Sequence, residues 1–162
     1  MKEICEIRMK KYILLFIIVL NSKIILAHCQ IPCGIYDDAI RIIQIREDFQ
    51  TIERAMLKIN DLSNNLSPLA LNQLNRWIIE KEKHSSKIQN IIANYFLTQR
   101  IKETNPKYIE QTTTLQKILV LAMKCKQTVE IDNVEKGLQL VASFSALYFD
   151  AHGLEYLETL SN

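Results

Sequence analysis

The sequence predicts an all-α protein, an antiparallel four-helix bundle with up-down-up-down topology that follows a short N-terminal segment of different character. Two observations predict this fold class. The 162 residues contain only three glycines and three prolines, too few for the many tight turns of a β-sandwich or barrel. Four long segments repeat apolar residues at three- and four-residue spacing, as amphipathic helices of a bundle do.

Residues 1–27 have the features of a signal peptide. Lys10 and Lys11 precede an unbroken apolar run over residues 12–20, and Ala27 offers a small residue at the cleavage position. The run is shorter than the ~20 residues that span a bilayer. We expect cleavage after Ala27, export to the periplasm or outside of the cell, and no stable membrane association afterwards. An uncleaved anchor and a cytoplasmic location are the alternatives.

The first helix is expected to start at Asp37 and Asp38, because carboxylates accept the unpaired N–H groups of a first turn. Its apolar positions continue to about Asn60, where a polar loop begins. They are Ile42, Ile45, Phe49, Ile52, Met56 and Ile59.

The second helix is expected over about 69–101, after Ser67-Pro68, since proline suits the first helical position. Residues 81–87 form a polar middle that we expect to be a solvated face. The aromatic cluster of this helix is expected in the core. It consists of Trp77, Tyr95 and Phe96.

The third helix follows the turn at Asn105-Pro106 and ends among Lys124 and Lys126. It should turn Ile109, Leu115, Ile118, Leu119, Ala122 and Met123 inward. The fourth helix begins after Thr128 and is expected to end near Gly153. It presents Val134, Leu138, Val141, Ser145 and Tyr148, with Leu140, Phe144 and Leu147 alongside.

Charge and cysteine content exclude several classes of protein. Residues 1–27 contain five basic and two acidic residues, so their removal lowers the net charge from +2 to about −1. Nucleic acid is therefore not expected as a partner, because phosphate binding needs a concentrated basic face. The paired ligands of a Cys₂His₂ zinc finger are absent. Cys125 is expected to be buried and inert.

Residues 28–37 read His-Cys-Gln-Ile-Pro-Cys-Gly-Ile-Tyr-Asp. Cleavage after Ala27 would give His28 a free α-amine beside its imidazole. Cys29 offers a thiolate and its amide nitrogen, and Cys33 adds a second thiolate. Such nitrogen and sulfur donors suit a square-planar ion such as Ni(II) or Cu(II), whereas Mg²⁺ and Ca²⁺ prefer oxygen. The segment therefore predicts a metal-binding hook.

The pattern H-C-x-x-P-C-G-x-Y-D resembles the nickel hook of nickel-containing superoxide dismutase, and every fixed position is present. The segment from Trp77 to Lys102 is similar to the second helix of that family, and Met123 to Gln127 to its third. The likeness extends from Asp37 to about Thr128. We therefore expect a leader over 1–27, the hook over 28–36 and a four-helix bundle over 37–162.

The resemblance implies an enzyme, a superoxide dismutase that converts two superoxide anions to O₂ and H₂O₂ by Ni(II)/Ni(III) cycling, with one nickel ion per chain. It implies that His28, Cys29 and Cys33 ligate nickel, with the His28 imidazole binding only in the oxidised state. Tyr36 would lie beside the open coordination face as a second active-site residue. Tyr36 and Tyr95 would restrict access of substrate.

The resemblance also implies supporting residues and an assembly. Pro32 fixes φ in the hook, and Gly34 permits a left-handed backbone there. Family members orient the axial imidazole with a glutamate and an arginine. Here the like-placed residue is Gln44, no arginine is clearly placed, and His84 is a candidate replacement. A homohexamer is expected from the family.

One alternative function stays open at this point. The chain would then be an exported, non-catalytic helical protein whose N-terminus binds copper or nickel, or whose Cys29 and Cys33 form a disulfide. Whichever function holds, His84 and His152 are expected to be surface or capping histidines rather than metal ligands.

Overall fold

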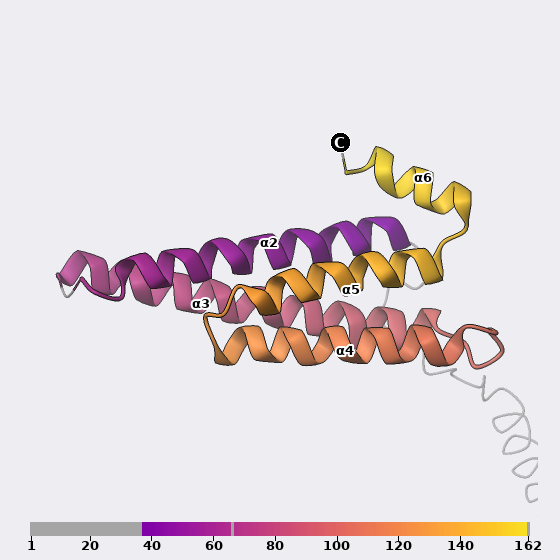
Figure 1. Ribbon diagram of the computed structural model, residues 1–162, viewed down its shortest axis with the longest axis horizontal. Helices are drawn as coiled ribbons and strands as arrows, with labels where there is room; N and C mark the ends of the chain where they lie inside the picture. Colours follow the sequence, from indigo (N-terminus) through magenta and orange to yellow (C-terminus); the bar gives the residue numbers. More distant parts are fainter. Residues whose placement is uncertain (1–36, 66, 162) are drawn as a thin grey trace, which may run out of the picture.

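The computed structural model describes residues 37–65 and 67–161, which contain helices and no strand. The leader expected over 1–27 and the hook expected over 28–36 lie outside the described residues. Four helical segments lie side by side in alternating directions, which confirms the predicted bundle (Figure 1). In chain order the elements are α2 (Asp38–Leu62), α3 (Pro68–Asn90), η1 (Ile91–Arg100), α4 (Tyr108–Gln127), α5 (Asp132–Tyr148) and α6 (Ala151–Thr159).

Helix α2 begins where its side-chain chemistry predicts. A carboxylate oxygen of Asp37 accepts hydrogen bonds from the backbone N–H groups of Ala39, at 2.7 Å, and Ile40, at 3.3 Å. The donors of the first turn are thereby paired. All six apolar positions predicted for this helix, from Ile42 to Ile59, are buried. One face of α2 therefore lies against the rest of the bundle along its whole length.

The second predicted helix is continuous but has two kinds of winding. Ser67 caps α3 by accepting from the N–H of Ala70, with Pro68 in the first turn. From Ile91 the backbone is wound as a π-helix, in which N–H groups bond to carbonyls five residues earlier. The N–H of Ile101 donates to the carbonyl of Phe96 in this way, at 2.9 Å. The hydrophobic pattern contains no sign of this change.

Two expectations for the later helices are wrong. Ile109 and Met123 of α4 are 70% and 41% exposed, because they lie on the side of α4 that no other described helix covers. Gly153 does not end the fourth helix. Helix α5 ends at Tyr148, and Gly153 lies inside the separate helix α6, where its N–H donates to the capping carboxylate of Asp150.

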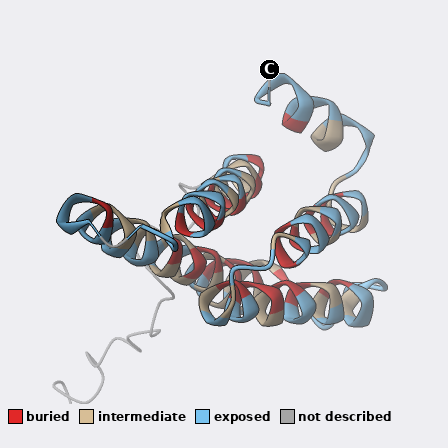
Figure 2. Cartoon of the chain, turned by 60° about the vertical axis from the view of Figure 1, so that its left-hand side comes forward, coloured by how far each residue is buried: buried red, intermediate tan, exposed pale blue. Residues whose placement is uncertain are grey.

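The buried residues gather where the four helices face one another (Figure 2). Aromatic rings fill the core near the start of α2 and the end of α5. Phe96 makes edge-to-face contacts with Tyr95, Phe144 and Tyr148 at centroid separations of 5.2, 5.1 and 5.6 Å. Such contacts are the favoured geometry for aromatic pairs. This aromatic cluster fixes the position of η1 against α5.

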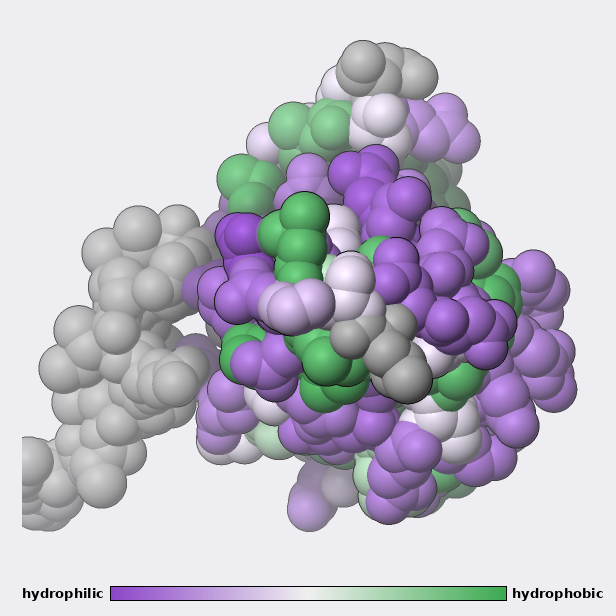
Figure 3. All heavy atoms as spheres, turned by 90° about the vertical axis from the view of Figure 1, so that its left-hand side faces the viewer, coloured by the Kyte–Doolittle hydropathy of each residue, from purple (hydrophilic) through white to green (hydrophobic). Residues whose placement is uncertain are grey.

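The hairpin of α2 and α3 extends beyond α4 and α5 (Figure 1). Seen from the end of this hairpin, apolar side chains interrupt a mostly hydrophilic surface (Figure 3). On α3 the exposed apolar residues include Leu69, Leu71, Ile78 and Ile79. Within the described ranges, no helix combines the length and apolar character that crossing a membrane requires.

Candidate active site

The described chain begins directly after the predicted hook. His28, Cys29, Pro32, Cys33, Gly34 and Tyr36 lie outside the described residues, whereas Tyr95 lies within them. Among residues 37–65 and 67–161, no group of three or more histidine, cysteine, aspartate or glutamate side chains could hold a metal ion. The described residues nearest to the predicted hook are therefore those at the end of the bundle where α2 begins.

Tyr95 lies on η1 at this end of the bundle, with 4% of its surface exposed. Its hydroxyl donates to a carboxylate oxygen of Asp38. The Arg100 guanidinium donates to the same hydroxyl from Nη2, at 2.8 Å, and lies over the ring, 4.9 Å from its centroid. The guanidinium carbon of Arg41 is 5.4 Å from that centroid. Tyr95 is thus held by polar contacts as well as by core packing.

The carboxylate of Asp38 joins Tyr95 to two further groups. The Nε of Arg100 lies 2.9 Å from Oδ1 of Asp38, and the hydroxyl of Tyr148 donates to Oδ2 at 2.7 Å. Asp38 comes from the first turn of α2, Tyr95 and Arg100 from η1, and Tyr148 from the last turn of α5. We call these four residues the Asp38 cluster.

Both tyrosines of the Asp38 cluster are kept protonated by their surroundings. Burial raises the pKa of Tyr95, and its hydrogen bond to Asp38 raises the pKa further, while Arg100 lowers it. Burial also raises the pKa of Tyr148 well above its ordinary value, with Asp38 acting in the same direction. The phenols therefore remain neutral hydrogen-bonding groups at physiological pH.

Sequence reasoning missed Asp38, Arg100 and Tyr148 as parts of the site. Arg100 follows Tyr95 by five residues, a spacing that puts two side chains on different faces of an α-helix. The π winding of η1 aligns residues five apart, so the two side chains meet. The sequence indicates only that Asp38 can stabilise the first turn of a helix, because its partners Tyr95 and Tyr148 are far away along the chain.

A cavity of about 670 Å³ opens between α2 and α3, and no residue of the Asp38 cluster lines it. Gln44, which the resemblance led us to expect at the position of the imidazole-orienting glutamate, lines it and accepts a hydrogen bond from Nη1 of Arg41 at 2.8 Å. The sequence left no arginine clearly placed for this role, and the structure puts Arg41 beside Gln44. Because they are three residues apart on one helix, the pairing is local and can be read from spacing.

His84 lines the same cavity and is neither a surface nor a capping histidine. Its side chain is 16% exposed, and its Nδ1 lies 2.5 Å from a carboxylate oxygen of Asp48. Lys87 lies 3.9 Å from the same oxygen. Burial raises the pKa of Asp48, although His84 and Lys87 oppose the rise. The other histidine of the bundle, His152, is exposed on α6, as expected for a surface position.

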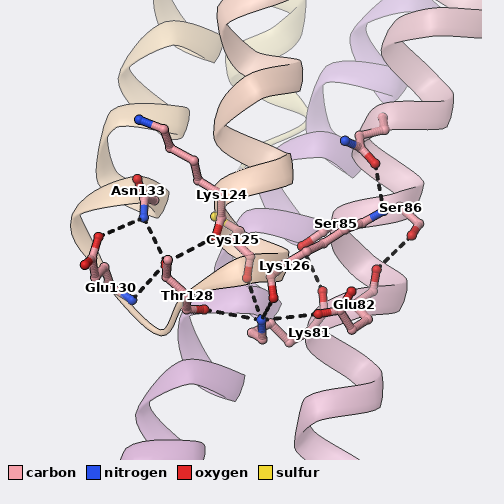
Figure 4. Close-up of polar contacts among 11 residues, drawn as sticks. Lys81, Glu82, Ser85, Ser86, Lys124, Cys125, Lys126, Thr128, Glu130 and Asn133 are labelled. Atoms are coloured by element: carbon pink, nitrogen blue, oxygen red, sulfur yellow. Dashed lines mark hydrogen bonds and ion pairs between the residues drawn. The ribbon is translucent and has the colours of Figure 1, made fainter.

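The polar middle of the second helix is not wholly solvated, because Lys81 is buried. Its ammonium group donates to the backbone carbonyls of Cys125, Lys126 and Thr128 at 2.7, 2.5 and 3.3 Å (Figure 4). These carbonyls lie at the end of α4, where no intrahelical donor remains. Lys81 thus takes the place of a C-terminal cap, supplied by another helix.

Cys125 is buried and free, as expected. Burial raises the pKa of its thiol to about 11, and the nearby Lys81 opposes the rise. A thiol in this state is a poor nucleophile and a poor metal ligand, since both roles need the thiolate.

The comparisons with known proteins agree with the fold. One solved structure similar to this chain is a native nickel superoxide dismutase, with a TM-score of 0.52 and 19% sequence identity, covering 75% of this chain and 96% of the other. At this identity the likeness shows the fold alone. No curated protein sequence matches the chain. A family model described as nickel-containing superoxide dismutase matches residues 23–152, which is most of the sequence. The chain therefore belongs to the nickel-containing superoxide dismutase family.

Proposed function

We propose that the mature chain begins at His28 and holds nickel through His28, Cys29 and Cys33. The chain is a nickel-dependent superoxide dismutase by its family, an oxidoreductase with superoxide as substrate. The observation that carries the site proposal is the complete hook pattern over residues 28–37. Family membership favours this function over a non-catalytic protein that binds copper or nickel or contains a Cys29–Cys33 disulfide.

The donor set fits nickel. Two thiolates, an amine and a deprotonated amide suit a square-planar ion and donate enough charge to stabilise its higher oxidation state. Among the mature chain's three cysteines, Cys125 is buried with a pKa of about 11. Cys29 and Cys33 are therefore the cysteines available as thiolates.

Chain connectivity keeps the proposed ligands near the Asp38 cluster. Cys33 precedes Asp38 by five residues, and five residues span at most about 18 Å. Tyr36 precedes Asp38 by two. This supports a site at the end of the bundle where Tyr95 lies, with Tyr36 and Tyr95 controlling the approach of substrate.

The reaction converts two superoxide anions and two protons to O₂ and H₂O₂. Nickel supplies the one-electron chemistry when it is bound. The chain's own residues would bind the metal, form hydrogen bonds to water or product, and control access to the site. The thiolates of Cys29 and Cys33 and the amide nitrogen of Cys29 would supply negative charge to the metal, and the His28 imidazole would supply a further nitrogen donor. Tyr36 and Tyr95 hydrogen-bond to water or peroxide and limit access, while Pro32 and Gly34 shape the hook.

The test compares two full mature chains loaded anaerobically with nickel. One begins at His28, and the other has one alanine before His28, which removes the free α-amine from that residue. We expect high dismutase activity in the first and near-total loss in the second. Cys29→Ser and Cys33→Ser should lose thiolate-to-nickel charge-transfer absorption, whereas the matched control Cys125→Ser should keep it. Equal activity of the two chains would exclude the amine as a ligand, and an inactive first chain with bound nickel would exclude dismutation at this site.

We further propose that residues 1–27 are a leader that is cleaved, that residues 28–36 form the hook, and that residues 37–162 form the helical domain. We also propose that the protein is exported. The basic residues, apolar run and Ala27 support this. The N-terminal residue of the mature protein, determined by mass spectrometry after cell fractionation, tests both statements. An N-terminus other than His28 would contradict the cleavage site, and mature protein in the cytoplasm would contradict export.

We also propose a homohexamer with no stable membrane association after cleavage. The exposed apolar side chains of α3, Leu69, Leu71, Ile78 and Ile79, support contact with another copy. Native mass spectrometry of the mature protein tests this assembly. A monomer at micromolar concentration, or partition into vesicles, would contradict the proposal.

A further inference from the structure

The carboxylate of Asp38 is the centre of a hydrogen-bond network that joins three helical elements. It accepts from the hydroxyls of Tyr95 and Tyr148 and pairs with Nε of Arg100, at 2.9 Å. Arg100 also donates to the Tyr95 oxygen, at 2.8 Å. Asp38, Tyr95 and Arg100 therefore form a closed triangle in which each member contacts the other two.

The chemistry of the three groups fixes where the Tyr95 hydrogen points. A guanidinium group has donors and no acceptor, so the Tyr95 oxygen must accept from Arg100. The carboxylate of Asp38 accepts, so the phenolic hydrogen is directed to Asp38. The network thus selects one orientation of the Tyr95 hydroxyl, with Arg100 placing a positive charge beside it.

Helix capping does not account for Asp38, because Asp37 has that function. The Asp37 side chain bonds the N–H groups of Ala39 and Ile40. The side chains of Asp38 and Arg100 are 26% and 27% exposed, although Tyr95 is buried. The charged part of the network therefore lies at the rim of the bundle, within reach of solutes, while the ring is anchored in the core.

We propose that Asp38 and Arg100 are positioning residues for superoxide dismutation, which fix the Tyr95 hydroxyl in one orientation and place a guanidinium charge beside it where the anionic substrate approaches. This inference rests on the access role proposed for Tyr95. Positive charge at a site entrance raises the rate of encounter with an anion, and the effect weakens as salt is added.

The first test is a double-mutant cycle on the full mature nickel-loaded chain. Asp38→Asn and Tyr95→Phe should each lower kcat/KM by about tenfold, because a misoriented group near the reacting atoms loses most of its effect. The double variant should be no slower than either single variant, since Asp38 acts through Tyr95. Asp38→Glu, which keeps the charge, should recover part of the activity. Nickel content and the charge-transfer spectrum should not change.

The second test separates the contribution of Arg100. Arg100→Gln should raise KM and reduce the dependence of kcat/KM on ionic strength, while Arg100→Lys should keep most of that dependence. The matched control is Asp132→Asn, which breaks an exposed pair with Lys136 at the start of α5. It should leave both kinetic constants unchanged.

A readout independent of activity is the ring-carbon NMR signal of isotope-labelled Tyr95 as pH is raised. The charged and titratable groups that face Tyr95 in the described part of the chain are Asp38 and Arg41 from α2, Tyr148 from α5 and Arg100 from η1. Ionisation of Tyr95 should move to lower pH in Asp38→Asn and to higher pH in Arg100→Gln. A general loss of structure would move both variants in the same direction.

The outcomes distinguish this inference from the proposed function. An active wild type whose activity and Tyr95 signal are unaffected by Asp38→Asn would overturn the inference alone. Strictly additive effects in the double variant would also overturn it. An inactive wild type with bound nickel would overturn the proposed function and the inference together.

Discussion

The ammonium group of Lys81 lies 2.7 Å from the backbone carbonyl oxygen of Cys125, although the two residues are on different helices. Two further carbonyls at the end of α4 accept from the same group, so one side chain pairs three acceptors. A buried ammonium group is tolerated because three carbonyl oxygens accept hydrogen bonds from it. This arrangement ties the middle of α3 to the last turn of α4.

Lys81→Met should lower the free energy of unfolding by about 2 kcal/mol, because three carbonyls at a helix end lose their shared charged donor. The matched control is Lys83→Met, two residues along on the exposed side of α3, where the expected change is within about 0.5 kcal/mol. Urea unfolding of the full mature chain measures both. Equal effects of the two substitutions would show that the Lys81 contacts do not stabilise the bundle.

Cys125 should resist alkylation in the folded protein. A thiol with a pKa of about 11 has about one thiolate per thousand molecules at about pH 8. Reduced, metal-free protein treated with iodoacetamide at this pH should be modified at Cys29 and Cys33 only, and peptide mass spectrometry identifies the sites. In denaturant Cys125 should react as well. Rapid modification of Cys125 in the native state would contradict its burial.

Asp48 should make stability depend on pH. Burial raises its pKa above the ordinary value of 3.8, so the folded state binds the proton more tightly than the unfolded state. This contribution to stability is present below that value and is lost as pH rises through the folded-state pKa. The wild type should therefore lose stability relative to Asp48→Asn as pH rises from about 4 to 7.

Thermal unfolding of both proteins at a series of pH values checks this expectation. Asp61→Asn, which changes an exposed aspartate at the end of α2, is the control and should show no such trend. A wild type that instead gains stability relative to Asp48→Asn as pH rises would mean that the pairing with His84 outweighs burial.

Gly137 should not tolerate a side chain. A β-carbon added there would lie 2.5 Å from two ring carbons of Phe49, which is fully buried, so the ring or the helix would have to shift. Gly137→Ala should destabilise the protein by about 1–3 kcal/mol, although alanine favours helix more than glycine does. Phe49→Leu in the Gly137→Ala background should recover part of the loss. Unchanged stability of the single variant in urea unfolding would contradict this contact.

Much of the fold and the hook could be predicted from the sequence, because the interactions that determine them are local. The apolar face of α2, the Asp37 cap and the Ser67-Pro68 start depend on residues within a turn of one another, and the structure confirms them. The hook pattern is local as well, since its donors lie within six residues of one another. Family membership and the nickel cofactor agree with that pattern.

Tertiary packing decided the rest, because the deciding contacts join residues far apart in sequence. The spacing of Ile109 and Met123 cannot show that no described helix covers them, and the lysine-rich stretch of α3 cannot show that Lys81 meets the end of α4. The Asp38 cluster depends on packing in the same way. Asp38 meets Tyr148 only because α2 and α5 are neighbours in the bundle, and Tyr95 meets Arg100 only because η1 winds five residues into alignment. The sequence by itself determined which donors the hook offers, whereas the packing of three helical elements determined which residues hold Tyr95.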